Sequence, residues 1–343
     1  MKTDIDYIYG NTLPNPGTAM EVSPGIRWIR MPLPFALDHV NLFLLDDGIE
    51  GWVLVDTGLA SKTTQDLWEL ILANELCDKH ISRILITHFH PDHIGNAGWL
   101  CKRTGAQLYM SRTEWLSARI TLAERQEDFQ EDIQNFYSLT GISDLSSFEV
   151  NDFAAQFHRI VSPVPPLYRR IREKTSLVIS GKTWTPILSE GHSPEHICLY
   201  CSEGNILIGG DFLLPQISPN VSVWWNEPEV NPLADYIQFL ENLNYMQSSI
   251  LVLPAHELPY RGLQKRCSAL LAHHKEQLQL VLEACSLPST VLDVTYKMFK
   301  RQFDPNQLSF AIGESLAHLN YLMGIGKIER NLDASGFWRY KIK

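Results

Sequence analysis

The sequence lacks any uninterrupted apolar stretch that approaches the length of a membrane-spanning helix. Its first residues are acidic and polar, and they contain no apolar segment of the kind that a secretory signal peptide requires. Cysteine is scarce, with six residues scattered over 343 positions. Without a visible export signal, we expect these cysteines to be reduced thiols in a cytoplasmic protein that makes no membrane contact.

Composition sets a frame for the fold. Hydrophobic residues make up 45% and charged residues 20% of the chain, as is usual for a soluble globular protein. The length exceeds one average domain and leaves room for an accessory unit.

Cys198 and Cys201 form a Cys-x-x-Cys pair, which would suggest a redox or zinc site if the side chains met. They fall in an expected strand, where an offset of three places them on opposite faces, so a shared site is disfavoured.

The most informative segment is Thr87 to Gly95, where three histidines and an aspartate fall within six positions. Imidazole nitrogens and carboxylates are the ligands that divalent transition metals such as zinc prefer. The segment follows an expected strand at residues 81–87 and precedes an expected helix at residues 94–106. Such a position, at the end of a strand, is where α/β sheets usually carry their chemistry. The candidate ligands in this segment are His88, His90, Asp92 and His93.

This His-x-His-x-Asp-His pattern resembles that of the metallo-β-lactamase-fold hydrolases, with a ligand set like that of glyoxalase II. The resemblance implies an α/β fold, an αββα sandwich. It also predicts four further motifs, and the sequence contains all of them in order. They are Asp56 in VLVDTG, His192 in GHSPEH, Asp211 in LIGGD and His256 in PAHE.

Carried over from that family, the motifs imply two adjoining metal sites. His88, His90 and His192 would hold one metal ion, Asp92, His93 and His256 the other, and Asp211 would lie between them. Asp56 would support the ligand loop without binding metal. Paired divalent ions generate a hydroxide nucleophile at neutral pH and polarise the substrate oxygen. Asp92 would orient that hydroxide and shuttle its proton. Zinc is favoured for both ions, with iron or manganese left open.

Residues 112–177 form an expected insertion in a catalytic domain that spans residues 1–260. Apolar and aromatic residues recur there at roughly helical spacing among acids and glutamines. In this family such an insertion would lie over the metal pocket as a helical lid. A helical pair that packs on the core is an equally supported interpretation, and the two are compatible.

Near the end of the insertion, a proline-rich turn presents Tyr168 beside Arg169, Arg170 and Arg172. Arginine side chains suit carboxylate or phosphate groups, and a tyrosine hydroxyl can donate to a developing oxyanion. Tyr168 and Arg169 are therefore candidate substrate-binding residues. A solvated charged face that compensates the acidic insertion is the more ordinary interpretation of the arginines.

Residues 261–343 have a different character, with expected helices followed by a short hairpin. This order resembles the winged-helix-like domain found on a subset of these hydrolases.

The segment from residue 261 onward contains 12 basic and seven acidic residues, a net charge of +5, so the remainder of the chain carries a net charge of −15. An acidic catalytic body repels polyanions, and nucleic acid is therefore disfavoured as a partner. The tail could support a homodimer. His273 and His274 are expected on a helix surface.

Three activities are compatible with this ligand set. Hydrolysis of an ester, thioester or lactone of a small-molecule substrate by a metal-bridging hydroxide is the leading hypothesis. Phosphodiester cleavage, as in a ribonuclease, is the alternative. The family resemblance also leaves an iron-dependent sulfur dioxygenase as a less favoured activity, since sulfur dioxygenases of this fold bind one iron with overlapping ligands.

Overall fold

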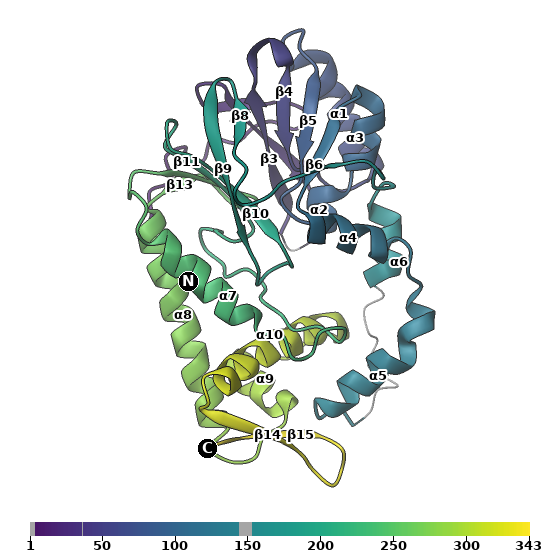
Figure 1. Ribbon diagram of the computed structural model, residues 1–343, viewed down its shortest axis with the longest axis vertical. Helices are drawn as coiled ribbons and strands as arrows, with labels where there is room; N and C mark the ends of the chain where they lie inside the picture. The colour runs from purple at the N-terminus through teal and green to yellow at the C-terminus, as the bar shows by residue number, and fades with distance from the viewer. Residues whose placement is uncertain (1–3, 36, 144–152) are drawn as a thin grey trace.

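The computed structural model in Figure 1 describes residues 4–35, 37–143 and 153–343. Two β-sheets form the centre of its upper half, and helices cover them on both outer sides. The C-terminal helices and a small hairpin lie in the lower half, together with helix α5 (Gln130–Leu139) of the insertion.

The first sheet has seven strands whose order in space follows their order in the chain. Its first four strands are antiparallel, and the remaining strands join β4 in parallel. The parallel half places several strand ends at the same edge, where side chains that follow the strands can meet. The strands are β1 (Met20–Ser23), β2 (Ile26–Pro32), β3 (His39–Asp46), β4 (Trp52–Val55), β5 (Ile81–Leu85), β6 (Gln107–Met110) and β7 (Arg169–Arg170).

The second sheet has six strands in the order β13-β12-β11-β10-β9-β8. Only β11 and β12 pair in parallel. The strands are β8 (Leu177–Ile179), β9 (Lys182–Ser189), β10 (His196–Cys201), β11 (Ile206–Gly210), β12 (Leu251–Pro254) and β13 (Tyr260–Arg261).

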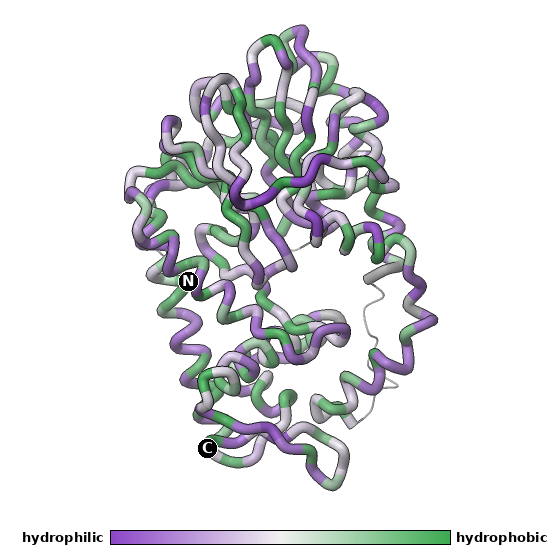
Figure 2. Tube along the Cα trace, viewed as in Figure 1, coloured by the Kyte–Doolittle hydropathy of each residue, from purple (hydrophilic) through white to green (hydrophobic). Residues whose placement is uncertain are grey.

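Hydrophobic packing defines the layers. One cluster fills the space between the sheets, with Trp28 and Phe43 from the first and Leu199 and Ile208 from the second. Hydrophobic residues recur along these strands in the upper half of Figure 2. The outer face of the first sheet is covered by α1 (Lys62–Asn74) and α3 (Ala97–Thr104), and that of the second by α7 (Pro232–Leu243) and α8 (Leu263–Ala284). The expected αββα sandwich is confirmed.

Strand β10 separates two cores, because its successive side chains point to opposite faces. Cys198 lies in the cluster beneath the C-terminal helices, whereas Cys201 lies between the sheets. Both are buried and free of disulfides. The prediction that these two side chains lie on opposite faces of one strand is confirmed.

The insertion contacts two different parts of the molecule. Helices α4 (Arg112–Thr121) and α6 (Phe153–Ile160) pack on the first sheet's outer cluster. Helix α5 (Gln130–Leu139) instead packs among residues of the C-terminal segment. Residues 144–152 of the predicted lid lie outside the described residues. Shorter helices are η1 (Gly48–Glu50), α2 (Pro91–Ile94) and η2 (Gln126–Phe129).

The C-terminal segment continues from α8 through α9 (Val291–Phe299) and α10 (Pro305–Gly324) to a hairpin of β14 (Ile328–Leu332) and β15 (Trp338–Ile342). Asp304 caps α10, and Thr290 with Asp293 forms a capping box on α9, so each helix begins where its first N–H groups are satisfied. The expected helices and hairpin are present. The winged-helix interpretation and the boundary at residue 261 stay predictions.

One surface prediction in this segment is wrong. His274 is 1% exposed, and its Nδ1 lies 3.3 Å from Nε2 of the buried His318. The helical spacing placed the histidine on α8 correctly but gave no information on which face α10 would cover.

Among the residues that the structure describes, every helix is too short or too polar to span a membrane.

Candidate metal centre

The turn after β5 gives His88 and His90 their positions. His90 is the N-cap of the short helix α2 in an extended conformation, and Pro91 occupies its first turn, where a missing N–H costs nothing. The backbone oxygen of His90 accepts from the N–H groups of His93 and Ile94. A side chain at Gly95 would come within 2.5 Å of the Gly58 carbonyl oxygen, so the close packing of this turn requires glycine.

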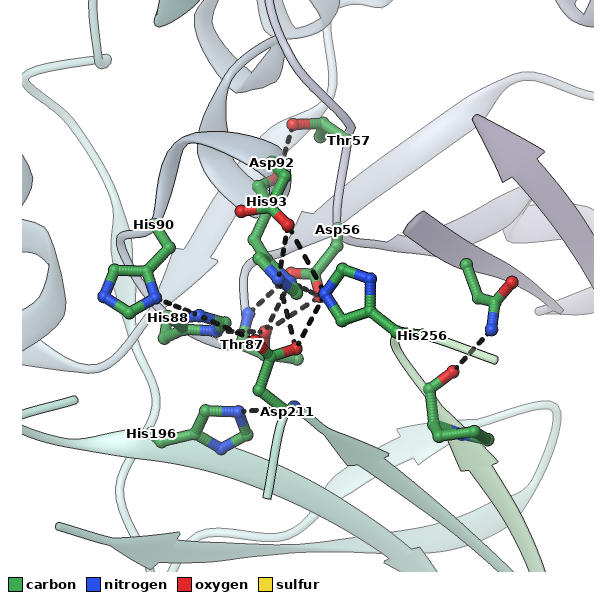
Figure 3. Close-up of polar contacts among 12 residues, drawn as sticks. Asp56, Thr57, Thr87, His88, His90, Asp92, His93, His196, Asp211 and His256 are labelled. Carbon is green, nitrogen blue, oxygen red and sulfur yellow. Dashed lines mark hydrogen bonds and ion pairs between the residues drawn. The ribbon is translucent and has the colours of Figure 1, made fainter. Parts of the chain in front are cut away.

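The side chains named from the sequence gather into two groups, each with potential ligand atoms within 4.8 Å of one another. The polar contacts among most of these residues are drawn in Figure 3. The first group comes from the turn after β5 and from loops of the second sheet, and the second group from α2 and the end of β12. The first group is His88, His90, His192 and Asp211, and the second is Asp92, His93 and His256.

The two carboxylate oxygens of Asp211 face different groups of potential ligands. Its Oδ2 lies 3.3 Å from His192 Nε2, in the first group. Its Oδ1 lies 3.3 Å from His93 Nε2 and 3.5 Å from His256 Nε2, in the second. A carboxylate in this position could be shared by a metal ion held in each group.

Three atoms in the centre that could bind a metal ion are buried and make no hydrogen bond. His93 Nε2, His192 Nε2 and Asp211 Oδ1 have no partner of suitable geometry, although the first and last lie only 3.3 Å apart. Buried polar atoms are costly unless they are satisfied. One cation in each ligand group would satisfy these atoms, so the residues present fit divalent metal ions.

The charge balance points the same way. Burial opposes a charge on His93, but Asp92, Asp211 and Asp56 outweigh it and raise its pKa well above the ordinary value. Burial likewise opposes ionisation of Asp92, but the charge on His93 prevails and lowers its pKa to about 2. Three carboxylates in a buried centre therefore demand positive charge, which divalent cations would supply.

Asp56 lies beneath the ligand turn. Its Oδ2 accepts from His93 Nδ1 and from the Thr87 hydroxyl, both at 2.8 Å, while its Oδ1 accepts from the Thr87 N–H at 2.8 Å. These contacts leave His93 Nε2 directed toward Asp92 and Asp211. Asp56 is outside both ligand groups, and the supporting role that the family resemblance implies for it stays a prediction.

Two backbone oxygens orient the histidines of the second sheet. His192 Nδ1 donates to the Asn220 oxygen at 2.8 Å, and His256 Nδ1 donates to the His39 oxygen at 2.7 Å. Each contact leaves Nε2 for the centre. Neither contact could be predicted from the sequence, because any residue can offer a backbone oxygen and no side-chain signal marks the position.

His196 supports Asp211 without joining the ligand groups. Its Nε2 accepts from the Asp211 N–H at 3.3 Å, and its ring stacks on Phe212 at 4.3 Å. A side chain at Gly210 would lie 2.4 Å from the His196 ring, and Gly210 has a φ of +51°. The glycine before Asp211 is thus required by both its conformation and its neighbour.

The candidate substrate residues lie near the insertion. Tyr168 stacks on Trp115 with ring centroids 4.5 Å apart, and Arg169 is exposed on β7. Arg170 and Arg172 line a cavity of about 540 Å³ together with Glu195, whose carboxylate lies 3.8 Å from Arg170. A substrate contact by Tyr168 or Arg169 stays a prediction.

Comparison with known proteins decides the family. The model of the Metallo-beta-lactamase superfamily matches residues 36–256, and that of the Metallo-beta-lactamase-like, C-terminal domain matches residues 278–343. The chain belongs to the metallo-beta-lactamase superfamily. It is thereby a member of a family of metal-dependent hydrolases, as the motifs predicted.

Relatives of this superfamily member span nearly its whole length. A beta-lactamase domain protein from Burkholderia ambifaria is 39% identical with a TM-score of 0.92, over 99% of this chain and 98% of that one. A metallo-beta-lactamase family protein from Thermus thermophilus is 29% identical with a TM-score of 0.79, over 94% and 100%. The probable metallo-hydrolase YqjP of Bacillus subtilis is 24% identical, over 86% and 91%.

Proposed function

We propose that this protein uses two divalent metal ions, preferably zinc, to hydrolyse an ester, thioester or lactone of a small molecule. The observation that carries the proposal is the position of Asp211, whose two oxygens face two separate groups of ligands. The imidazole-rich composition of both groups favours zinc.

Bound in pairs, divalent ions lower the pKa of a water molecule and polarise a substrate carbonyl oxygen. The chain's own contribution is positional. Asp92 Oδ2 lies 3.5 Å from His93 Nε2 and 3.4 Å from His256 Nε2, with 18% of its side chain exposed. From this position the carboxylate can orient a nucleophile through a hydrogen bond and accept its proton.

The charges of the tail support a small-molecule substrate over nucleic acid. In the hairpin, Arg330 pairs with Glu229 at 2.6 Å, Arg339 with Asp333 at 2.7 Å and Lys341 with Glu329 at 3.1 Å. Paired side chains have little positive charge to offer to phosphates, and the remainder of the chain is strongly acidic.

Metal quantification coupled to a substrate panel tests this proposal. We expect two zinc ions per chain and turnover of acyl thioesters, esters or lactones. Asp92→Ala should lower kcat/KM by at least ~100-fold, since it removes both a proton acceptor and a proposed ligand of the second metal ion. Asp66→Ala, which removes an exposed carboxylate paired with Lys62, is the control and should retain activity.

Other outcomes would contradict the proposal. Absence of turnover across the acyl panel by protein loaded with two metal ions would refute acyl hydrolysis. Phosphodiester turnover together with salt-sensitive nucleic-acid binding would favour a nuclease. One iron per chain would favour the dioxygenase alternative.

A further inference from the structure

Glu114 is a buried carboxylate that joins two loops of the centre. It belongs to α4 in the insertion and is 0% exposed. Its Oε2 accepts from the Phe89 N–H at 2.8 Å. Its Oε1 accepts from the Ser193 hydroxyl at 2.6 Å and from the Glu195 N–H at 2.7 Å.

All of these contacts lie beside ligands of the first group. Phe89 stands between His88 and His90, and Ser193 directly follows His192. The second group has different supports, since Asp56 orients His93 and the His39 oxygen orients His256. Glu114 therefore spans the gap between the two segments that supply every histidine of the first group.

We propose that Glu114 is a positioning residue for the first metal ion. It sets the separation of the His88–His90 turn and the His192 loop, so that three imidazoles converge on one cation. The inference rests on the two-metal centre of the proposed function, and it adds that the insertion takes part in building that centre.

The chemistry of the contacts explains why a carboxylate is needed. Glu114 receives donors at both oxygens, and an ionised carboxylate can accept at both. Glutamine has the same shape but one oxygen, so its NH₂ group would face either the Phe89 N–H or the donors at Ser193 and Glu195. Loss of such an outer contact typically lowers metal affinity by ~10–100-fold.

Cobalt(II) binding by the full chain tests the inference without relying on turnover. Each variant is stripped of metal and titrated with Co²⁺ against a chromophoric chelator, while visible absorption bands report the two sites. His192→Ala and His256→Ala assign the bands to the first and second groups. In Glu114→Gln we expect affinity at the first site to fall by ~10–100-fold and the second site to change less than ~3-fold.

Glu314→Gln is the control, because it neutralises another carboxyl on a helix outside the centre. It should bind Co²⁺ as wild type does. Should Glu114→Gln fail to fold, Ser193→Ala removes a single donor, and the same site should weaken by a smaller factor.

Two results would overturn the inference. The first is wild-type affinity at both sites in Glu114→Gln, or in Ser193→Ala if only that variant folds. The second is equal weakening of both sites with a matching loss of metal-free thermal stability, which indicates a purely structural role. Two-site Co²⁺ binding without acyl turnover would refute the proposed reaction and leave the role of Glu114 standing.

Discussion

At the scale of single residues, the centre depends on a carboxylate that occupies a restricted backbone conformation. Asp56 has a φ of +60°, a left-handed conformation in which most residues are strained. From there it accepts from the backbone and the hydroxyl of Thr87 and from His93 Nδ1. Its position thus fixes both the ligand turn and the orientation of one imidazole.

Asp56→Asn separates these two contributions. Asparagine tolerates the left-handed conformation, so the backbone should be retained. Its amide has one acceptor oxygen fewer, so the contact to His93 or to Thr87 is lost. We expect affinity at the second metal site to fall by ~10–100-fold in a chelator competition assay. Unchanged affinity at both sites would show that the hydrogen bond to His93 is dispensable.

At the scale of elements, α5 connects the insertion to the C-terminal segment. The Thr140 oxygen accepts from the Leu292 N–H at 3.0 Å, and the rings of Phe136 and Trp338 lie 6.0 Å apart. Because α4 and α6 pack on the first sheet while α5 packs on the C-terminal segment, the insertion is held by two different parts of the fold. Its flanking helices are fixed to the catalytic core, and its middle helix is fixed to the tail.

Gly141→Ala should loosen the contact between the middle of the insertion, near α5, and helix α9. Gly141 has a φ of +101°, and a Cβ there would lie 2.7 Å from Thr290 Cβ. Gly105→Ala is a matched control, since Gly105 also has positive φ (+78°) but its Cβ would meet nothing within 4 Å. We expect faster amide hydrogen exchange of residues 130–139 in Gly141→Ala only. Equal exchange in both variants would mean that backbone strain alone matters.

At the scale of the whole molecule, stability should depend on pH through the buried histidines between α8 and α10. His318 is fully buried. Its Nδ1 donates to the backbone oxygen of Glu314 at 2.8 Å, and its Nε2 faces His274. Burial lowers the pKa of His318 to about 4. Between pH 6.5 and 4 the unfolded chain therefore binds a proton that the native state does not, and acid destabilises the fold.

Urea unfolding of metal-free protein at pH 7, 6 and 5 measures this effect. His318 should contribute a loss of up to ~1.4 kcal/mol per pH unit below pH 6.5. His318→Gln should show a shallower decline than wild type, although it is less stable at pH 7. His158→Gln, at an exposed position on α6, should retain the wild-type slope. Parallel slopes for all three proteins would contradict the assignment.

The parts of this molecule that could be predicted from sequence are those with a local cause. The ligand turn follows a strand of apolar residues, which was expected at residues 81–87 and is present as β5 (Ile81–Leu85). The helices of the tail also follow from periodicity and caps. Each of these features is decided by residues that are neighbours in the chain.

The remaining features depend on contacts between distant segments. The oxygens of His39 and Asn220 orient ligands that are 217 and 28 positions away. Glu114 is one acid among many in the insertion, and its role depends on where α4 packs. His274 is buried because α10 covers it, which a helical pattern on α8 alone cannot reveal.

The core beneath the second sheet links the tail to the centre. Phe212, the neighbour of Asp211, packs in one continuous cluster with residues of α7, α8 and the hairpin. The Tyr236 hydroxyl also donates to the Phe212 oxygen at 2.9 Å. A substitution in the tail that disturbs this cluster should therefore reach the neighbour of Asp211 through direct packing. In this sense the tail is part of the support of the centre.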